Sequence, residues 1–210
     1  MDFLKLAEKR RSVHDFKKKQ VPENDLYYVL ESARWAPSAG NSQPWRFIVV
    51  RDEAIKKKLA YPCYNQKWMA DAPVLIVVCS NKESERQFPN NGKLLADHSI
   101  GAAIQNMLLA AESKGLSTCW VAVSSEARIK NIFEIQDDIE IQAVVALGYA
   151  RRKTYAPAPR LDSHALTHWD AWDTKETDLA MYKTGDVTKP LMERKKVKKL
   201  KEKLRFRRKR

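Results

Sequence analysis

Five residues near the N-terminus combine charges and a hydroxyl in a way that suits phosphate binding. The segment is Arg10-Arg11-Ser12-Val13-His14. Guanidinium groups make paired, charge-assisted hydrogen bonds to phosphate oxygens, and the hydroxyl and the imidazole can add further contacts. Basic residues at the end of a helix also complement the helix dipole without binding any ligand. The segment alone therefore leaves both interpretations open.

A second cluster has the composition of a loop that closes on a flat ligand. It runs Ala36-Pro37-Ser38-Ala39-Gly40-Asn41-Ser42-Gln43-Pro44-Trp45. Small residues let the backbone approach a ring closely, and Ser38, Asn41 and Gln43 supply hydrogen-bond donors and acceptors. An ordinary connection between a helix and a strand has similar turn residues, so this alternative also stays open.

Taken together, the two clusters resemble the paired N-terminal signature of the FMN-dependent nitroreductase family. The resemblance continues in the family's order through later segments and covers about residues 1–172. These segments are Asp71-Ala72-Pro73-Val74, Gln105-Asn106-Met107-Leu108-Leu109-Ala110-Ala111, Gly115-Leu116-Ser117-Thr118-Cys119-Trp120, Ala146-Leu147-Gly148-Tyr149, Pro157-Ala158-Pro159-Arg160 and His168-Trp169. Several segments in order are more specific than any single motif.

The resemblance implies an α+β fold with a central mixed or antiparallel sheet flanked by helices. It also implies an intertwined homodimer that binds FMN at the subunit interface. The family positions that bind the phosphate and ribityl chain are matched by Arg10, Arg11, Ser12, His14 and Arg160. The loop that reaches the flavin from the other subunit is matched by Pro37, Ser38, Ala39, Asn41 and Gln43. Asn65 matches an amide that faces the pyrimidine edge, and Val121 and Ala122 match the segment that passes the flavin N5 atom.

The implied reaction carries electrons from NADH or NADPH through FMN to a small acceptor, such as a nitroaromatic compound or a quinone. Because the flavin performs the redox chemistry, we assign no catalytic acid or base. Three residues depart from the family pattern: His14 stands where Arg or Lys is common, Ala150 where Pro is frequent, and Ala122 where Gly or Glu is common. Relatives with this fold include dehalogenases and flavin-fragmenting enzymes, so a different chemistry on the same flavin is one alternative.

Hydrophobic periodicity predicts the elements that must position these clusters. Helices are expected around residues 3–7, 26–33, 91–114 and 126–133, where apolar residues recur every three or four positions or form a long apolar stretch. Short apolar runs predict strands over residues 45–50, 74–79, 116–123 and 141–147, and we expect the first two to be central. Residues 100–111 are apolar on nearly every side of their helix, so their own domain or a partner subunit must cover them.

The composition is that of one globular domain with an appendage. The chain has 210 residues, of which 44% are hydrophobic, and no apolar run reaches the roughly 20 residues that a bilayer span requires. The N-terminus has no signal-peptide pattern, so we expect a cytoplasmic protein.

Cys63, Cys79 and Cys119 form no C-x-x-C pair and are expected to be reduced and structural. His164 and His168 have no third ligand fixed by spacing, so we expect no metal site.

Most of the net charge of +13 lies at the C-terminal end. Lys189 to Arg210 contains thirteen Lys or Arg and two Glu, a net charge of +11. We therefore divide the chain into an FMN-binding domain, residues 1–172, and a C-terminal extension with a basic tail, residues 173–210. An apolar stripe of Val197, Leu200 and Leu204 within the tail fits an amphipathic basic helix attracted to phosphate or to anionic lipid, and a nucleic-acid-associated protein is therefore the main alternative function. A solvated extension that aids solubility is the other interpretation of the tail.

Overall fold

The structure, a computed structural model, describes residues 2–152 and 159–173. These residues belong to two compact units, Met1–Pro157 and Ala158–Arg210. The basic tail lies outside the described residues, as do Pro157 and Ala158. Within the described ranges, no helix combines the length and the apolar character that crossing a bilayer requires.

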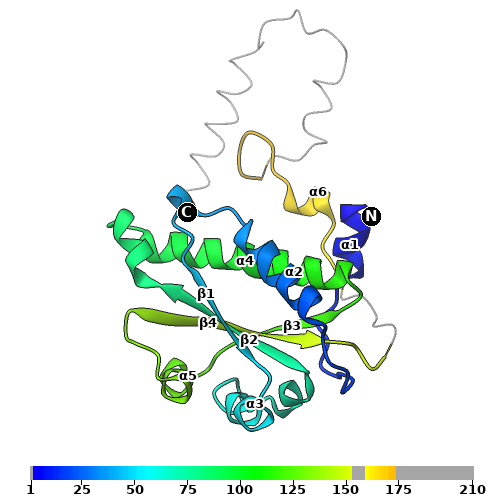
Figure 1. The fold of residues 1–210 in the computed structure, drawn as a ribbon. Helices are drawn as coiled ribbons and strands as arrows, with labels where there is room; N and C mark the ends of the chain where they lie inside the picture. Colours follow the sequence, from blue (N-terminus) through cyan, green and yellow to red (C-terminus); the bar gives the residue numbers. More distant parts are fainter. Residues whose placement is uncertain (1, 153–158, 174–210) are drawn as a thin grey trace, which may run out of the picture. The chain divides into compact units, whose positions relative to one another are not determined.

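Helices and strands alternate irregularly along the first unit (Figure 1). The α-helices are α1 (Phe3–Lys9), α2 (Glu23–Arg34), α3 (Glu53–Ala60), α4 (Gly92–Ser113) and α5 (Glu126–Phe133). The strands are β1 (Trp45–Val50), β2 (Val74–Asn81), β3 (Ser117–Val121) and β4 (Ile139–Gly148). Short 3-10 helices form η1 (Ala39–Asn41), η2 (Lys67–Asp71) and η3 (Lys82–Gln87). The second unit contains the helix α6 (Ser163–Leu166).

Local side chains set several of the helix starts. Asp2 Oδ1 accepts a hydrogen bond from the Leu4 N–H at 3.0 Å, and Asp52 Oδ1 accepts one from the Ile55 N–H at 2.8 Å. Both aspartates thereby satisfy N–H groups that have no partner inside the helix. The first turns of α1 and α3 are therefore fixed by the residue that precedes each helix.

The strands form one antiparallel sheet in the order β1-β2-β4-β3. Helices α2 and α4 cover one face of this sheet, and α3 and α5 lie against the other face (Figure 1). The central strands β2 and β4 are buried along most of their length. This arrangement confirms the predicted α+β class with an antiparallel sheet.

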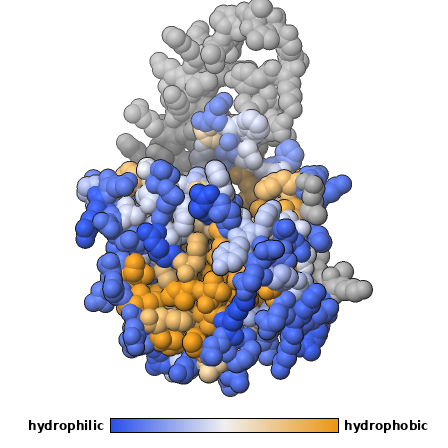
Figure 2. Space-filling model, in the orientation of Figure 1, coloured by the Kyte–Doolittle hydropathy of each residue, from blue (hydrophilic) through white to orange (hydrophobic). Residues whose placement is uncertain are grey.

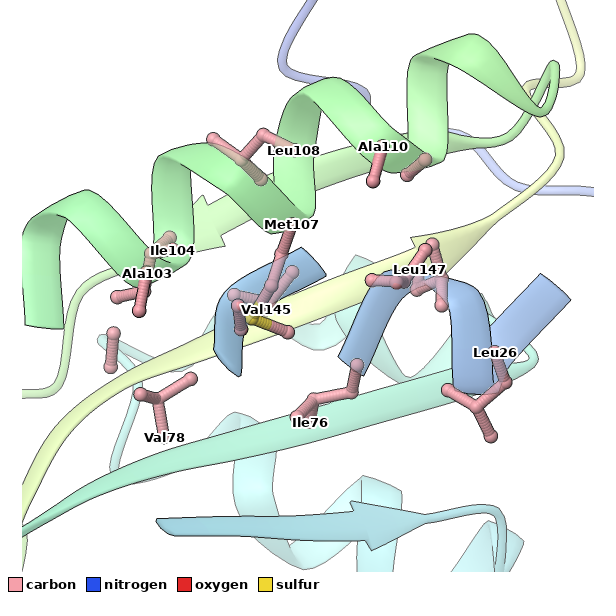
Figure 3. Close-up of a cluster of buried hydrophobic side chains, with 14 of the residues drawn as sticks. Leu26, Ile76, Val78, Ala103, Ile104, Met107, Leu108, Ala110, Val145 and Leu147 are labelled. Atoms are coloured by element: carbon pink, nitrogen blue, oxygen red, sulfur yellow. The ribbon is translucent and has the colours of Figure 1, made fainter. Parts of the chain in front are cut away.

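Alternate residues of β2 contribute to two separate hydrophobic clusters. Val74, Ile76 and Val78 pack under α2 and α4, against residues such as Leu26 and Met107 (Figure 3). The residues between them point to the opposite face and pack against α3 and α5. The alternation follows from the two-residue period of a strand. Both faces of β2 are therefore apolar, which explains its unbroken hydrophobic sequence.

A glycine at the end of β4 permits three segments to meet closely. A Cβ atom on Gly148 would lie 2.7 Å from Cγ of Pro73 and 3.0 Å from Cδ1 of Phe16. Pro73 precedes β2, and Phe16 belongs to the segment that follows α1. A side chain on residue 148 would therefore displace Pro73 first, and then Phe16.

The strand β1 lies at the edge of the sheet, so the prediction that it is central is wrong. In the described part of the chain it pairs with β2 alone, and Val49 is 38% exposed. Burial is complete only at the ends of the strand: Phe47 and Ile48 are partly buried against the two hydrophobic clusters, whereas Arg46 and Val49 are exposed. Helix α3 was not predicted. Its apolar face consists of little more than Ile55 and Leu59, and the three consecutive lysines between them obscure the helical spacing of apolar residues.

Helix α4 is covered mainly by its own unit. Ile100, Ala103, Ile104 and Met107 are at most 2% exposed. Only Gln105 is exposed between residues 100 and 111. The apolar character of α4 therefore does not by itself require a partner subunit.

Candidate functional site

The segment that follows α1 runs along the outer strand of the sheet. The backbone becomes extended at Arg10 (ψ 132°). Ser12 forms a parallel bridge with Thr118 of β3, and the Val13 N–H donates to the Thr118 carbonyl oxygen at 2.9 Å. The first predicted cluster is therefore attached to β3 by backbone hydrogen bonding.

The same segment is held at its other end by residues that follow β4. Phe16 is fully buried and forms an antiparallel bridge with Ala150. The Arg151 guanidinium lies 2.8 Å from Oδ1 of Asp15, and the Arg151 N–H donates to the Asp15 carbonyl oxygen at 2.9 Å. These contacts fix the backbone on which the predicted phosphate ligands are carried.

The two arginines of the cluster have different surroundings. The Arg11 guanidinium donates to the carbonyl oxygen of Arg10 at 2.9 Å and also to that of Glu8, at the C-terminal end of α1. These contacts match the interpretation in which a cation complements a helix end. Burial raises the pKa of Cys119 to about 11, while the Arg10 charge and a hydrogen bond with Ser12 lower it. The positive charge of Arg10 therefore lies close enough to β3 to lower the pKa of the Cys119 thiol.

His14 connects this cluster to the segment that contains Asn65. Its ring centroid lies 4.3 Å from that of Trp68, with the two planes inclined at 36°. Trp68 belongs to η2 and follows Asn65 by three residues. The Phe16 ring stacks on the same indole at a centroid distance of 6.4 Å. The fold therefore brings the N-terminal cluster against η2.

Asn65 lies in a turn with an unusual backbone conformation. Tyr64 and Asn65 have φ angles of 57° and 55°, in the left-handed region that residues other than glycine seldom occupy. The Tyr64 N–H donates to Oγ of Ser124 at 3.2 Å, three residues after the end of β3. Val121 is buried and Ala122 is exposed at that end. The structure thus joins the Asn65 turn to Ser124, which follows Ala122 by two residues.

The loop that contains Pro37 and Gln43 also has a constrained backbone. Gly40, Asn41 and Gln43 have φ angles of 55°, 56° and 45°. The Gln43 N–H donates to Oγ of Ser38 at 3.1 Å, and Gln43 Nε2 donates to Oδ1 of Asn41 at 3.1 Å. Backbone strain of this kind is concentrated at binding and catalytic sites. The geometry therefore favours a binding loop over an ordinary connection.

This loop and the N-terminal cluster contact different ends of α4. The Ala39 N–H donates to Oγ of Ser99 at 3.4 Å, in the first half of the helix. Lys9, next to the cluster, pairs with Glu112 near the helix end at 3.0 Å. At 1.5 Å per residue, the two contact points are about 20 Å apart along the helix axis. The structure therefore does not bring the loop to the cluster within one chain.

Arg160 belongs to the second unit and is exposed. Its Nη1 donates to the carbonyl oxygen of Pro159 at 3.4 Å. In the same unit, the rings of His168 and Trp172 stack at a centroid distance of 4.3 Å. The role of Arg160 at a phosphate stays a prediction.

Three residues that the sequence did not single out hold these segments in place. They are Thr118, Ser99 and Ser124, and each bonds to a residue at least 60 positions away. One local signal was available, because two serines precede α5, where a serine commonly caps a helix. Ser125 occupies the cap position but makes no side-chain cap bond, and Ser124 binds the Asn65 turn instead.

The cysteine thiols near these segments are not activated. Burial raises the pKa of Cys63 from its ordinary value of 9.0 to about 12, so the thiol stays protonated at neutral pH. In residues 2–152 and 159–173, no three His, Cys, Asp or Glu side chains are grouped to hold a metal ion. Ser12 lies beside Thr118 near the start of β3, and the Asn65 turn is bonded to Ser124 just beyond the end of the strand. A cation, a hydroxyl and an amide are therefore spread along β3, which suits an elongated anionic ligand with a polar ring.

The sequence matches a known family model and curated relatives over most of its length. A model of the Nitroreductase family matches residues 7–64 and 60–149. An NADH dehydrogenase of Thermus thermophilus is 30% identical over 198 residues, an alignment that covers 80% of this chain and 96% of that protein.

Solved structures share the fold. A nitroreductase family protein of Clostridium difficile superimposes with a TM-score of 0.71 and 30% identity, over 81% of this chain and 99% of that chain. An oxidized iodotyrosine deiodinase bound to FMN and 3-iodo-L-tyrosine gives a TM-score of 0.67 and 26% identity, over 77% of this chain and 96% of that chain. The similarity therefore extends through both predicted clusters and the sheet that carries them.

Proposed function

This chain belongs to the nitroreductase family, and on that basis we propose that it is an FMN-dependent oxidoreductase. In this proposal NADH or NADPH reduces a small acceptor, such as a nitroaromatic compound or a quinone. The observation that carries the proposal is that three segments are held at β3. They are the Arg10–His14 cluster, the Asn65 turn, and the residues up to Ala122 that end the strand. The side chains of these three segments are of the chemical types that bind the phosphate group and the ring of FMN.

The donor set at β3 fits FMN. Arg10 and Ser12 provide a guanidinium and a hydroxyl for the phosphate group, and His14 adds a ring nitrogen. Asn65 provides an amide for the pyrimidine edge, and the small side chain of Ala122 leaves room beside the ring. When bound, FMN would supply the two-electron chemistry between the nicotinamide and the acceptor. The chain's own residues bind and orient the group, so we propose no catalytic acid or base.

We also propose that the protein is a homodimer in which the Pro37–Gln43 loop completes the partner's site. The separation of about 20 Å along α4 supports this, because one chain does not bring its loop to its own Arg10 cluster. Figure 2 shows an apolar patch on the face of the first unit where β1 lies foremost in Figure 1. Apolar patches of this kind commonly mark protein interfaces.

The experiment that tests the proposal is purification without added cofactor, followed by identification of any released flavin. We expect a yellow protein that releases FMN rather than FAD on denaturation and that oxidises NADH or NADPH in the presence of a quinone or a nitroaromatic compound. A colourless protein that fails to bind added FMN would refute the proposal.

A reductive dehalogenase is the second candidate function. It is favoured by the 26% identity with the iodotyrosine deiodinase structure. Release of iodide from 3-iodo-L-tyrosine by the reduced protein, faster than reduction of quinones, would favour this candidate over the first.

The basic tail adds a third proposal, which concerns a partner rather than the reaction. Its net charge of +11 favours contact with a polyanion such as a nucleic acid. We expect that removing the tail abolishes this contact and leaves flavin binding unchanged.

A further inference from the structure

The turn that carries Asn65 adopts a conformation that must be held by its surroundings. Tyr64 and Asn65 are consecutive residues with positive φ, a conformation that costs free energy when the residue is not glycine. Within the turn, the Asn65 N–H donates to the Tyr61 carbonyl oxygen at 3.2 Å, and the Gln66 N–H donates to that of Cys63 at 3.2 Å. These bonds shape the turn but do not anchor it to β3.

Ser124 anchors the turn through its hydroxyl and its backbone N–H. Its Oγ accepts the Tyr64 N–H at 3.2 Å and donates to the Pro62 carbonyl oxygen at 2.9 Å. The same carbonyl oxygen accepts the N–H of Ser124 at 2.8 Å and that of Ser125 at 3.2 Å. One side chain thus satisfies a donor and an acceptor on the two sides of Cys63.

The anchored segment leads directly to the end of β3. Ser124 follows Ala122 by two residues and Val121 by three. A second contact supports the same junction, because the Arg128 guanidinium of α5 lies 4.3 Å from the Tyr61 ring centroid. Ser124 therefore joins the Asn65 turn to the residues that follow Ala122.

We propose that Ser124 is a positioning residue that fixes Asn65 relative to Ala122 and so determines how tightly the flavin ring is held. This inference rests on the proposed function, in which Asn65 contacts the pyrimidine edge and Ala122 lies beside the ring. A hydrogen bond weakens steeply when its geometry changes, so a loosened turn costs ring affinity. The loss is greater for the reduced flavin, whose negative charge makes the amide hydrogen bond stronger.

The test compares variants that differ in one group. Ser124→Thr keeps the hydroxyl and adds a methyl group, Ser124→Val has the shape of Thr with a methyl group in place of the hydroxyl, and Ser124→Ala removes the hydroxyl. We expect the Val and Ala variants to bind FMN and riboflavin about three- to tenfold more weakly, by the same factor for both, and the Thr variant to bind nearly as the wild type does. Equal factors distinguish a ring effect from loss of a phosphate contact, which weakens FMN alone.

Two further measurements separate positioning from a general structural role. The flavin midpoint potential should become more negative in Ser124→Val and the visible absorption band should shift, with both restored in Ser124→Thr. Ser113→Ala is the matched control, since its Oγ donates to the Ala110 carbonyl oxygen at 2.7 Å far from the turn. It should change thermal stability little and leave both flavin signals unmoved. A midpoint potential unchanged in Ser124→Val would overturn the inference.

Wild-type measurements keep the inference testable if the Val and Ala variants do not fold. The Tyr64 amide should be protected from hydrogen exchange and should exchange more slowly when FMN is added. Exchange unaffected by FMN would overturn the role of Ser124. A wild-type protein that binds neither FMN nor riboflavin would refute the proposed function and the inference together, whereas normal flavin binding by Ser124→Val would refute only the inference.

Discussion

The guanidinium of Arg11 donates a hydrogen bond to the carbonyl oxygen of Arg10 at 2.9 Å, and the two adjacent cations have different surroundings. Arg11 contacts the end of α1, whereas the Arg10 charge acts on Cys119 of β3. Charge and sequence position are nearly the same for both. The structure therefore offers a matched pair for testing which cation binds a phosphate.

We expect Arg10→Ala to weaken FMN binding by about 1.5–3 kcal/mol and riboflavin binding much less, because only FMN has the phosphate. Arg11→Ala should mainly reduce the free energy of unfolding, by about 1 kcal/mol, through the lost helix-end contacts. Titration of both flavins and urea unfolding measure the two effects. Arg160→Ala is expected to behave like Arg10→Ala, and equal losses for the two flavins would show that an arginine acts structurally.

The buried thiols predict how stability depends on alkaline pH. The pKa of Cys63 is raised from 9.0 to about 12 in the folded state, so the folded thiol keeps its proton at pH values where the unfolded thiol loses it. The contribution of this thiol to the free energy of unfolding is fully present below pH 9. It falls as pH rises toward 12, by up to about 1.4 kcal/mol per pH unit.

Urea unfolding of the wild type and Cys63→Ala at pH 8 and pH 10.5 isolates this effect from other titrating groups. The free energy of unfolding should fall with pH less steeply in the variant. Identical slopes for the two proteins would contradict the role assigned to burial of the thiol.

A site shared between subunits predicts that two inactive variants rescue each other. One carries Arg10→Ala with Arg160→Ala, and the other carries Ser38→Ala with Asn41→Ala. In a mixed dimer, one site collects every defect and the other has none, so co-refolding should restore up to about half of the wild-type activity in each mixed dimer. Differential tags identify the mixed dimers. If these stay inactive, both clusters serve the same chain's site.

Removal of Glu193 to Arg210 separates the tail from the flavin site. We expect FMN content and turnover close to those of the wild type, together with loss of any salt-sensitive binding to polyanions. Gel filtration and nucleic-acid binding at several salt concentrations provide the measurements. A truncated protein that loses its flavin or its dimer would show that the tail belongs to the folded domain.

The sequence alone determined the helices and strands with strong periodicity and the chemical character of both clusters. β1 and α5 begin and end as predicted, and β2 and β4 are each longer by two or three residues. These properties depend on local patterns: apolar spacing, capping residues, and small or polar side chains within a few positions of one another. The edge position of β1 was missed because an apolar run reports burial but not the number of neighbouring strands.

Only the tertiary structure decided which predicted residues come together. Ser12 lies beside Thr118 and His14 against Trp68, while the Pro37–Gln43 loop contacts the other half of α4. Such contacts depend on strand order and on the path of the chain between elements, which no local pattern records. The hydroxyl of Ser124 shows the reason most directly. Its local sequence suits a helix cap, but the fold places the Tyr64 N–H and the Pro62 carbonyl oxygen within its reach, and those partners determine its role.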